Sequence, residues 1–368
     1  MEKTVNILGI RGIPAAHGGF ETFAQHFSLW LVERGWRVVV YCQHQADDET
    51  APQDGFEDEW QGVHRIHLRV KGGGSLSTIS FDLKAVRDVL KRPGIDLVLG
   101  YNTALFSMLQ RLKGRKVLMN MDGIEWKRDK WSIPAKIWFW INELIGAHIC
   151  TVPIADHPEI ACHLRRHGTR GIEVIPYGSA RIDDASVDPV RALGLEPGGY
   201  LISIARIEPE NSILEIVRSF SSRTRKTKLV VLGKFRRDDK YHIKVKQSAS
   251  EEVIFPGAIY DPTVVRSLRF HAAAYVHGHQ VGGTNPSLVE ALGAGNAIIA
   301  HNNRFNRWVA GDQQFYFADE QSLDAQFELV IADPTRRELA QLASRSNHET
   351  RFTLGGVHEA YHDLMLRL

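Results

Sequence analysis

Residues 277–300 constrain the fold of this chain more than any other stretch of its sequence. They begin with a glycine-rich loop of small polar residues, continue as a short helix that carries Glu290, and end in an apolar run after Gly293 and Gly295. The apolar run is typical of a buried parallel strand. Such a loop directs backbone N–H groups and the positive end of the helix dipole at one point, which favours an anion such as a diphosphate. An ordinary strand-to-helix turn of an α/β domain is the alternative interpretation.

Length and composition limit the class of protein. At 368 residues, the chain is too long for one ordinary core, so two domains are expected. An apolar fraction of 43% and a net charge of +2 are normal for a soluble globular protein, and this charge does not call for nucleic acid as a partner. The three cysteines, Cys42, Cys150 and Cys162, lack metal-ligand spacing and fit a reducing cytosol. With neither a signal peptide nor a membrane-spanning apolar run in the sequence, we expect a cytoplasmic protein.

The first half of the chain reads as alternating strands and helices. A strand at residues 4–10, a glycine-containing loop at 11–19, a helix from Phe20 to about Gly35 and a strand at 36–42 make a Rossmann-like opening. The loop lacks the Gly-x-Gly-x-x-Gly fingerprint, so a nicotinamide cofactor is not favoured. The sequence predicts loops at 47–62 and 72–80, and further strands at 63–70, 95–100 and 116–121. Predicted helices cover residues 81–91, 104–112 and 133–150.

A charged segment follows the strand predicted at residues 116–121. Asp122 lies just past the carboxyl end of this strand, where open α/β sheets bind their ligands. Glu125 and Arg128 add charge beside two tryptophans. An N-capping aspartate followed by a solvated charged face is the alternative interpretation.

The helix predicted at 133–150 is rich in aromatic residues. Trp138, Phe139 and Trp140 follow a basic stretch that includes Lys127, Arg128, Lys130 and Lys136. This composition fits a helix that lies on a membrane surface. A core helix with a basic flank is the more common explanation.

The second half starts a new series of strands at Tyr200. A linker with prolines and adjacent glycines is predicted at 179–198. The residue pair His277 and His279 lacks a clear third metal ligand, so a polar role in the loop is favoured over a metal site. A final helix is predicted at 357–368.

In the order of these features, the chain resembles the retaining nucleotide-sugar glycosyltransferases of family 4, which have the GT-B fold. Residues 281–288 and the Asp-Gly-x-Glu-Trp-x-Arg segment at 122–128 are similar to a subgroup typified by bacterial rhamnosyltransferases. Two family positions differ. Gly282 stands where the first glutamate of the Glu-x7-Glu pair is usual, with Glu290 at the second, and Asn211 stands where a lysine usually follows Arg206.

The resemblance implies an α/β protein of the GT-B class, with two Rossmann-like domains facing a cleft and a C-terminal helix that crosses back to the first domain. Residues 1–180 would form the acceptor-binding domain, 199–350 the donor-binding domain, and 351–368 the returning helix. Released diphosphate would be stabilised without a metal, because no Asp-x-Asp motif lies on a suitable loop. No cofactor is expected beyond the nucleotide sugar itself.

The resemblance also assigns roles to residues. Asp122 and Arg206 are the catalytic candidates, with Asp122 near the reacting sugar and Arg206 on the donor diphosphate. Glu290 would hold the ribose, and Lys234 is a candidate replacement for the missing lysine, although a surface lysine is an equal alternative. The remaining donor-binding candidates are Gly18, Gly19, Gly283, Thr284 and Asn285, and the acceptor-side candidates are Glu21, Glu125 and Arg128. For Glu21, a first-turn charge that stabilises the helix dipole is the alternative.

We therefore predict a retaining hexosyltransferase. Gly282 removes a carboxylate contact to the donor sugar, which suits a deoxy sugar, so the predicted reaction moves L-rhamnose from dTDP-L-rhamnose to a saccharide acceptor. A lipid-linked acceptor in surface polysaccharide assembly is the predicted setting. Peripheral attachment at the inner face of the membrane stays open. Two alternatives stay open: a UDP-hexose-dependent transferase, and a catalytically degenerate GT-B protein that binds a nucleotide without turnover.

Overall fold

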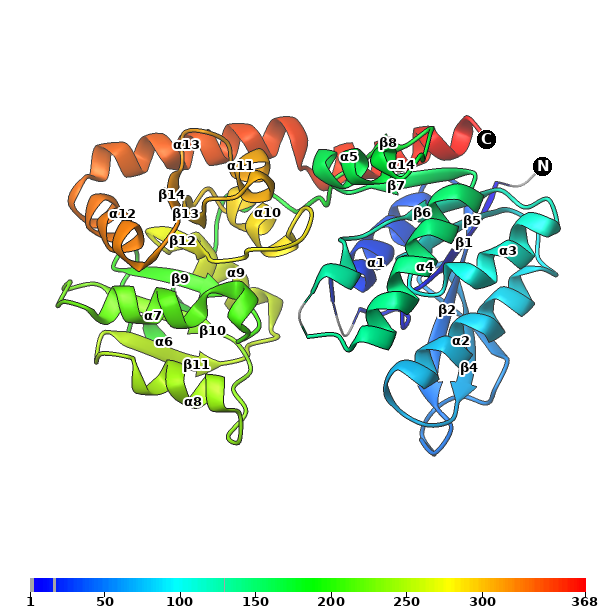
Figure 1. Ribbon diagram of the computed structural model, residues 1–368, viewed down its shortest axis with the longest axis horizontal. Helices are drawn as coiled ribbons and strands as arrows, with labels where there is room; N and C mark the ends of the chain where they lie inside the picture. The colour runs from blue at the N-terminus through cyan, green and yellow to red at the C-terminus, as the bar shows by residue number, and fades with distance from the viewer. Residues whose placement is uncertain (1–2, 16–17, 129) are drawn as a thin grey trace. The chain divides into compact units, whose positions relative to one another are not determined.

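The chain folds into two compact α/β units. The computed structural model describes residues 3–15, 18–128 and 130–368 (Figure 1). The first unit comprises Met1–Pro176 and His358–Leu368, and the second comprises Tyr177–Val357. Ala16 and His17, in the predicted first loop, and Asp129, in the segment after Asp122, lie outside the described residues.

The first unit is built on a mostly parallel sheet with the strand order β3-β4-β2-β1-β5-β6-β7-β8. The edge strand β3 pairs antiparallel with β4, whereas β1 pairs parallel with both β2 and β5. The buried strands are rich in Val, Ile and Leu, as expected when helices cover both faces of a parallel sheet. The strands are β1 (Thr4–Leu8), β2 (Arg37–Gln45), β3 (Phe56–Trp60), β4 (Val63–Val70), β5 (Ile95–Leu99), β6 (Val117–Asn120), β7 (Val152–Ala155) and β8 (Glu173–Val174).

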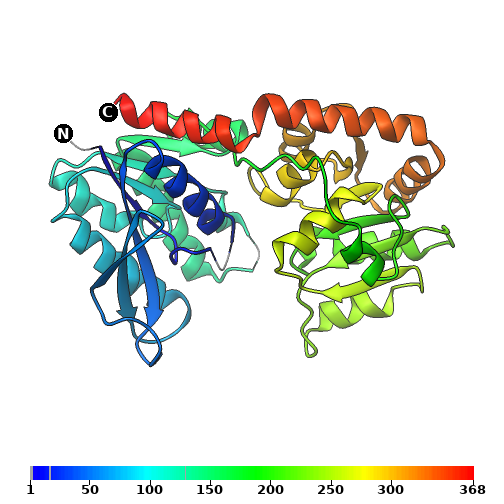
Figure 2. The ribbon, with the colours of Figure 1, turned by 180° about the vertical axis from the view of Figure 1, so that it is seen from behind.

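The helices of the first unit follow the strands in the βαβ manner. They are α1 (Gly18–Val32), α2 (Gly74–Val89), α3 (Ala104–Leu112), the 3-10 turn η1 (Glu125–Lys127), α4 (Ile133–Ile149), α5 (Pro158–Arg166) and, from the end of the chain, α14 (Leu354–Leu366), of which the part from His358 on belongs to this unit. Figure 2 shows α14 running along α1. The ring of Phe27 in α1 lies 5.6 Å from that of Tyr361 in α14, and Asn120 Nδ2 donates a 2.8 Å hydrogen bond to the Tyr361 hydroxyl.

Three predictions for the first unit are wrong in detail. The loop predicted at 47–62 contains β3, whose charged sequence is stabilised by cross-strand pairs such as Asp58 with Arg65. Helix α1 begins at Gly18, so Gly18 and Gly19 form its first turn and do not belong to a preceding loop. Helix α2 begins at Gly74, inside the loop predicted at 72–80. Glycine-rich sequence hides a helix start because glycine has low helix propensity.

The second unit is built on a parallel sheet with the strand order β11-β10-β9-β12-β13-β14. Its strands are β9 (Tyr200–Ile204), β10 (Lys228–Leu232), β11 (Val253–Gly257), β12 (Ala274–His277), β13 (Ala297–His301) and β14 (Phe315–Phe317). Its helical segments are α6 (Asp188–Ala192), η2 (Pro209–Asn211), α7 (Ile213–Ser221), α8 (Lys240–Gln247), α9 (Pro262–Phe270), α10 (Pro286–Gly293), α11 (Arg304–Ala310), α12 (Glu320–Ala332) and α13 (Pro334–Arg351). The linker predicted at 179–198 thus contains a short helix, α6.

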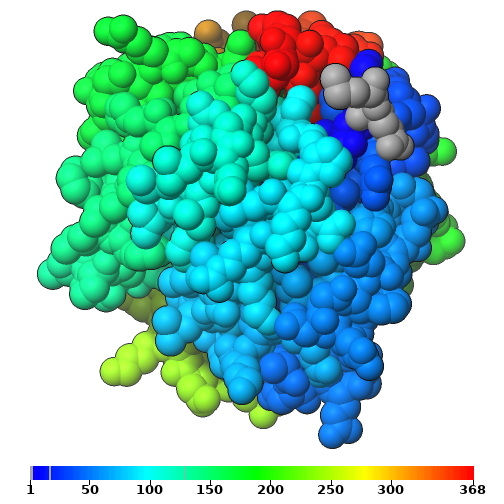
Figure 3. Space-filling model, turned by 90° about the vertical axis from the view of Figure 1, so that its right-hand side faces the viewer, coloured from blue at the N-terminus to red at the C-terminus, as the bar shows by residue number. Residues whose placement is uncertain are grey.

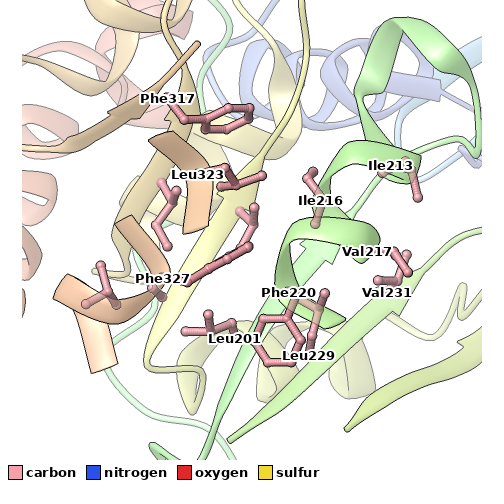
Figure 4. Packing of buried hydrophobic residues seen from close by; sticks show 14 of the residues in the cluster. Leu201, Ile213, Ile216, Val217, Phe220, Leu229, Val231, Phe317, Leu323 and Phe327 are labelled. Atoms are coloured by element: carbon pink, nitrogen blue, oxygen red, sulfur yellow. The ribbon is translucent and has the colours of Figure 1, made fainter. Parts of the chain in front are cut away.

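Two apolar clusters cover the faces of this sheet, and β9 contributes to both. Leu201 packs with α7 and α12 on one face, where the rings of Phe220 and Phe327 meet edge to face at 5.3 Å (Figure 4). Ile202 points to the other face, where it joins Leu288 of α10. Strand β9 pairs parallel with β12, so the loops after both strands lie at the same carboxyl edge of the sheet.

None of the described helices is both long and apolar enough to cross a membrane.

Candidate functional site

A small polar cavity lies at the carboxyl ends of β9 and β12 in the second unit. It measures about 150 Å³, below the roughly 300 Å³ of an ordinary ligand pocket. It therefore fits one group of a larger ligand, such as a phosphate or a single sugar. We call it the β9–β12 cavity; its lining is Ser203, Ile204, Ala205, Arg206, Asn211, Tyr275, Val276, His277, Gly278, His279, Asn285 and Ser287.

Two buried polar atoms of this cavity have no hydrogen-bond partner among the described residues. Asn211 is 2% exposed, and its Nδ2 donates a 2.8 Å hydrogen bond to the backbone oxygen of Arg206, but no described residue bonds to its Oδ1. His277 is 5% exposed and its ring stacks on that of Tyr275, but its Nε2 also meets no partner in the part of the chain that the structure describes. Burial lowers the pKa of His277 well below its ordinary value, so the ring is neutral. Buried polar atoms rarely stay unsatisfied, so these two indicate a ligand or water in the cavity.

The N-terminus of α10 supplies backbone donors beside these atoms. Asn285 caps the helix, because its side-chain oxygen accepts a 3.0 Å hydrogen bond from the Ser287 backbone N–H. The Ser287 hydroxyl lies 2.7 Å from the Tyr275 hydroxyl, which ties the first turn of α10 to β12. Thr284, one residue before the cap, is 5% exposed. The predicted glycine loop and helix N-terminus therefore form as expected, and positive potential gathers at this end of the helix.

Arg206 extends from the loop after β9 and lines the same cavity. Its side chain is 55% exposed, and its nitrogens lie 3.6 Å from Glu208 and 3.7 Å from Glu210. Both pairs are long and the guanidinium is more than half exposed, so each interaction is weak and the arginine can turn toward an anionic ligand at little cost. The structure thus brings Arg206 and Asn285 together in the cavity, as both assigned roles require.

Glu290 and Lys234 do not line the β9–β12 cavity. Glu290 lies on α10 and pairs with Arg269, whose Nη2 is 2.5 Å from Glu290 Oε2. Lys234 follows β10, is exposed, and makes no hydrogen bond or ion pair with any described residue. Gly283 is half-buried in the loop before Asn285. The roles assigned to these residues stay predictions.

The first unit has two adjoining cavities. The aromatic cavity, about 530 Å³, is walled by residues of α2, the start of α3, η1 and α4, and includes Asp82, Asn102, Thr103, Glu125, Trp131, Ala135, Trp138 and Phe139. The histidine cavity, about 470 Å³, includes Ile13, Cys42, Gln45, His44, Arg65, His67 and Ser77. Arg11, Glu21, Gln43 and Gly74 line both. Aromatic side chains beside hydrogen-bonding groups form surfaces that suit a sugar ring.

Both glutamates that are predicted on the acceptor side line these cavities. Glu21 stands in the first turn of α1, and its Oε1 lies 3.4 Å from the backbone nitrogen of Arg11. Glu125 accepts hydrogen bonds from Arg128 Nη1 at 2.7 Å and from Trp131 Nε1 at 3.0 Å. Arg128 itself does not line either cavity, so its contact here is through Glu125. Arg128 is thus placed to orient a carboxylate and not to touch a ligand in these cavities.

Asp122 lies past the end of β6, as predicted, in a left-handed backbone conformation with φ 46°. Its backbone N–H donates a 2.9 Å hydrogen bond to Asn120 Oδ1. Burial and the negative charge of Glu125 raise the pKa of Asp122 to about 6. Strained backbone and a raised pKa are common at functional sites, but Asp122 lines neither cavity of the first unit, and its role stays a prediction.

Sequence reasoning missed two features of the first unit. Asp82 on α2 lines the aromatic cavity, and burial raises its pKa to about 7 even though Thr103 Oγ1 donates to it at 2.8 Å. In the histidine cavity, His44 Nε2 lies 2.8 Å from His67 Nδ1, and His67 Nε2 lies 3.0 Å from Asp58 Oδ1. No local pattern marks either feature, because each joins segments that are distant in sequence.

Sequence reasoning also missed His277 and Asn211 in the second unit. Asn211 was noted only as a departure from the family pattern and His277 only as part of a weak histidine pair. Their position in the chain could have identified them. His277 ends a strand and Asn211 lies in the segment after a strand, at the carboxyl edge of the sheet, where α/β proteins bind ligands.

One group of described residues could hold a metal ion. The ligand atoms of Glu143, His163 and His167 lie within 4.8 Å of one another. Both carboxylate oxygens of Glu143 already accept hydrogen bonds, from Trp126 Nε1 at 3.1 Å and His163 Nε2 at 2.8 Å. The group is therefore satisfied as a hydrogen-bonded cluster, and it lines none of the three cavities.

Comparisons with known families divide the chain as its fold does. Residues 192–347 match the family model described as "Glycosyl transferases group 1". Residues 2–180 match a model described as "Domain of unknown function (DUF1972)". The search of curated proteins gave no match.

Solved structures of low sequence identity share the fold along the whole chain. Sucrose-phosphate synthase from Thermosynechococcus elongatus has a TM-score of 0.82 at 14% identity, with 100% of this chain and 99% of that chain covered. Anabaena Alr3699/HepE in complex with UDP has a TM-score of 0.75 at 12% identity, with both chains covered fully. A structure described as trehalose-6-phosphate from E. coli bound with UDP-2-fluoro glucose has a TM-score of 0.75 at 8% identity, with 100% and 99% covered.

The fold is that of the GT-B glycosyltransferases, and the predicted fold class is confirmed. Within the second unit, the match to the glycosyltransferase group 1 model covers residues 192–347. Membership of family 4 and of its rhamnosyltransferase-like subgroup stays a prediction.

Proposed function

We propose that this chain is a retaining, metal-independent hexosyltransferase that moves a sugar from a nucleoside diphosphate to a saccharide acceptor. The second unit would bind the donor and the first unit the acceptor. A lipid-linked acceptor in surface polysaccharide assembly is part of the proposal and rests on the resemblance to rhamnosyltransferases.

The observation that carries the proposal is the β9–β12 cavity with its two unsatisfied buried atoms, Asn211 Oδ1 and His277 Nε2. A sugar hydroxyl can donate to the asparagine oxygen, and a neutral imidazole nitrogen can donate to or accept from a donor oxygen. Arg206 and the first turn of α10 would stabilise the negative charge that develops on the departing diphosphate. This cation and these backbone donors are fixed parts of the protein, so we expect turnover to survive EDTA.

The acceptor side of the proposal rests on the aromatic cavity. Trp131 and Phe139 pack with ring centroids 5.0 Å apart, and Glu125 and Asn102 supply polar groups at the same cavity. A sugar has apolar C–H faces and a rim of hydroxyls, which this mixture of rings and polar groups matches.

Two donors are proposed. The loss of the usual carboxylate at Gly282 favours dTDP-L-rhamnose, because a deoxy sugar needs fewer hydroxyl contacts. The alternative is a UDP-hexose. It is supported by structural neighbours that hold UDP, UDP with glucose, or UDP-2-fluoro glucose.

The test is nucleoside diphosphate release from a panel of dTDP-rhamnose, UDP-glucose, UDP-galactose and GDP-mannose, with and without EDTA, in the presence of saccharide acceptors. Release from one donor that survives EDTA supports a metal-independent transferase and names its sugar. The anomeric configuration of the product, read by NMR, tests retention.

Arg206→Ala separates catalysis from binding. We expect it to lower kcat by roughly 10²- to 10³-fold, as is typical when one stabiliser of a developing anion is removed. The matched control is Arg191→Ala, an exposed arginine of the same unit that lines none of the described cavities. If the parent protein is stabilised by dTDP or UDP in a thermal-shift assay but turns over no donor with any acceptor, the degenerate binding protein replaces our proposal.

A further inference from the structure

Helix α3 has its apolar side chains on the outside. Leu105, Met108, Leu109 and Leu112 are 38%, 41%, 39% and 81% exposed, at the i, i+3, i+4, i+7 spacing that forms one stripe. The buried side of the same helix carries Ala104, Ser107 and Gln110. An ordinary surface helix has the opposite arrangement.

Helix α4, which packs against α3, is inverted in the same way. Ile133, Ile137, Trp140 and Ile141 are 74%, 52%, 42% and 41% exposed. The buried side holds Asn142, Glu143, Gly146 and Ala147. Each of these two neighbouring helices thus presents apolar side chains to solvent. We call the two exposed stripes together the α3–α4 face and define it by the four exposed residues of each helix. Figure 3 looks onto the side of the first unit where the cyan α3 and blue-green α4 segments reach the surface.

The buried polar residues show that this inversion is specified by the sequence. Gln110 Nε2 donates to Asp96 Oδ2 at 2.9 Å, and Asn142 Oδ1 accepts from the Leu105 backbone N–H at 2.9 Å. Glu143 is held by two donors, as described above. Rotating either helix to bury its leucines or isoleucines would break these hydrogen bonds. The polar groups that now form them would become exposed or would stay buried without a partner. The apolar stripe is therefore a stable feature of the surface, and such a feature commonly marks an interaction site.

The charges around the α3–α4 face identify that partner. Exposed lysines stand next to both helices, at Lys113 after α3 and at Lys127 and Lys130 before α4. The sequence of α3 has no acidic residue, and α4 has only Glu143, which is buried. A wide apolar stripe with a tryptophan and a basic rim matches the interface of an anionic bilayer.

We propose that the α3–α4 face docks the first unit on the surface of a bilayer that contains anionic phospholipid. The leucine and isoleucine side chains would enter the boundary between headgroups and acyl chains, and the lysines would contact lipid phosphates. The two helices that form this face also wall the aromatic cavity, through Asn102 and Thr103 just before α3 and through Ala135 and Trp138 of α4. Docking would thus bring the proposed acceptor cavity to the membrane, and this consequence rests on the proposed function.

The face is not the one that the aromatic cluster of α4 predicted. Trp138 Nε1 donates a 2.8 Å hydrogen bond to the backbone oxygen of Asn102, and Trp138 and Phe139 line the aromatic cavity. Only Trp140 of the three belongs to the α3–α4 face. Substituting Trp138 would therefore confuse loss of docking with damage to the cavity.

The test is vesicle flotation of the full chain without any donor or acceptor, using phosphatidylcholine alone and phosphatidylcholine mixed with phosphatidylglycerol. We expect the parent to float with the mixed vesicles. The double variant Leu112→Ser/Ile137→Ser should bind these vesicles at least about tenfold more weakly than the parent. The matched control is Leu339→Ser/Leu342→Ser, which changes two leucines of α13 that are 59% and 58% exposed. Lys113→Glu/Lys127→Glu should weaken binding to mixed vesicles, and high salt should do the same.

Three outcomes would overturn the proposal. The parent does not float with either vesicle; the apolar variant floats as well as the control; or the parent is a dimer by light scattering that Leu112→Ser/Ile137→Ser dissociates while no protein floats, which would assign the face to a second copy. Flotation needs no turnover, so its failure leaves the proposed reaction intact. Conversely, a protein that floats but releases no nucleoside diphosphate from any donor would retain the docking surface and lose the proposed function.

Discussion

Arg269 and Glu290 form a close ion pair in the second unit, with Nη2 of the arginine 2.5 Å from Oε2 of the glutamate. The arginine side chain is 8% exposed and the glutamate 32%, so the pair lies at the edge of the core. Arg269 Nη2 also lies 3.1 Å from the Ser287 hydroxyl at the start of α10. Glu290, the residue proposed to bind the ribose, is thus held in position by the buried guanidinium of Arg269.

Removing Glu290 should therefore cost stability as well as donor binding. Glu290→Ala leaves Arg269 buried without its counter-charge, a change that costs roughly 3–5 kcal/mol in a fully buried pair and about 2 kcal/mol here, because Glu290 is partly exposed. Glu290→Gln keeps an oxygen for Arg269 and should lose less. Urea unfolding measures the first effect, and thermal shift with dTDP and UDP measures nucleotide affinity.

The control for this pair is Glu196→Ala, which removes an exposed carboxylate of the same unit. Equal stability of Glu290→Ala and the control would show that the ion pair contributes nothing. Unchanged nucleotide affinity in Glu290→Gln and Glu290→Ala would remove Glu290 from the donor site.

Asp82 should make stability depend on pH. Burial raises the pKa of Asp82 from its ordinary value near 4 to about 7, so the folded state holds this proton more tightly than the unfolded state. The stability that protonated Asp82 contributes is fully present below the pKa of this carboxyl in the unfolded chain, and it is lost as pH rises through about 7. Asp82→Asn removes this dependence. As pH rises from 4 to 7, the free energy of unfolding of the variant should increase relative to that of the parent, by up to roughly 4 kcal/mol.

Denaturant unfolding at several pH values checks this expectation, with about pH 3 as the reference because the aspartate is mostly protonated there in both states. A difference between parent and Asp82→Asn that stays constant from pH 4 to 8 would contradict it. Asp82 lines the aromatic cavity, so the KM for a saccharide acceptor should also change in the variant, whereas the KM for the donor should not.

How far the sequence predicts this protein depends on how local the signal is. The glycine loop and α10 formed as predicted, because an asparagine cap, a proline in the first turn and an apolar stripe are all local in sequence. Strand β3 was missed, because its charges are stabilised by residues of β4. Glycines at the start of α2 concealed that helix.

The site was predicted in part for the same reason. Arg206 and Asn285 belong to motifs, and the structure brings them together in one cavity. His277, Asn211 and Asp82 become visible only when distant strands and helices meet. The α3–α4 face was also concealed, since periodicity shows that a helix is amphipathic but not which side is buried.

His358 should destabilise the first unit in acid. Its ring packs 5.4 Å from that of Phe27, it is 3% exposed, and burial, with smaller effects from His26 and Arg34, lowers its pKa to about 4. The unfolded state therefore binds the proton more readily. The corresponding stability is present above pH 6.5 and is lost as pH falls toward 4.

His358→Phe keeps an aromatic ring but cannot take a proton. Between pH 8 and pH 4, the parent should lose up to roughly 3 kcal/mol more than the variant. The difference at pH 8, where the histidine is neutral in both states, measures the packing change alone and serves as the internal control. Parallel stability curves for the two proteins from pH 8 to 4 would show that His358 does not titrate on unfolding.

Gly278 lines the β9–β12 cavity and should be sensitive to the addition of one methyl group. A Cβ at this position would overlap the backbone oxygen of Asn211 and lie 2.9 Å from both Ser212 Cβ and Ile216 Cδ1. The backbone here cannot give way easily. Ser212 has φ 52° and its hydroxyl donates a 2.8 Å hydrogen bond to the Gly278 oxygen.

Gly278→Ala should therefore displace Asn211 and lower stability by about 1–3 kcal/mol, the usual cost of overpacking a core. Nucleotide-sugar turnover should fall more than this stability loss explains, because Asn211 Oδ1 would no longer face the cavity. The matched control is Gly355→Ala in α14, where a Cβ meets no atom within 4 Å and alanine has the better helix propensity. Donor kinetics measured well below the melting temperature separate the two effects. If Gly278→Ala is destabilised but keeps its full kcat/KM for the donor, the cavity beside Asn211 is not where the donor sugar or its diphosphate binds.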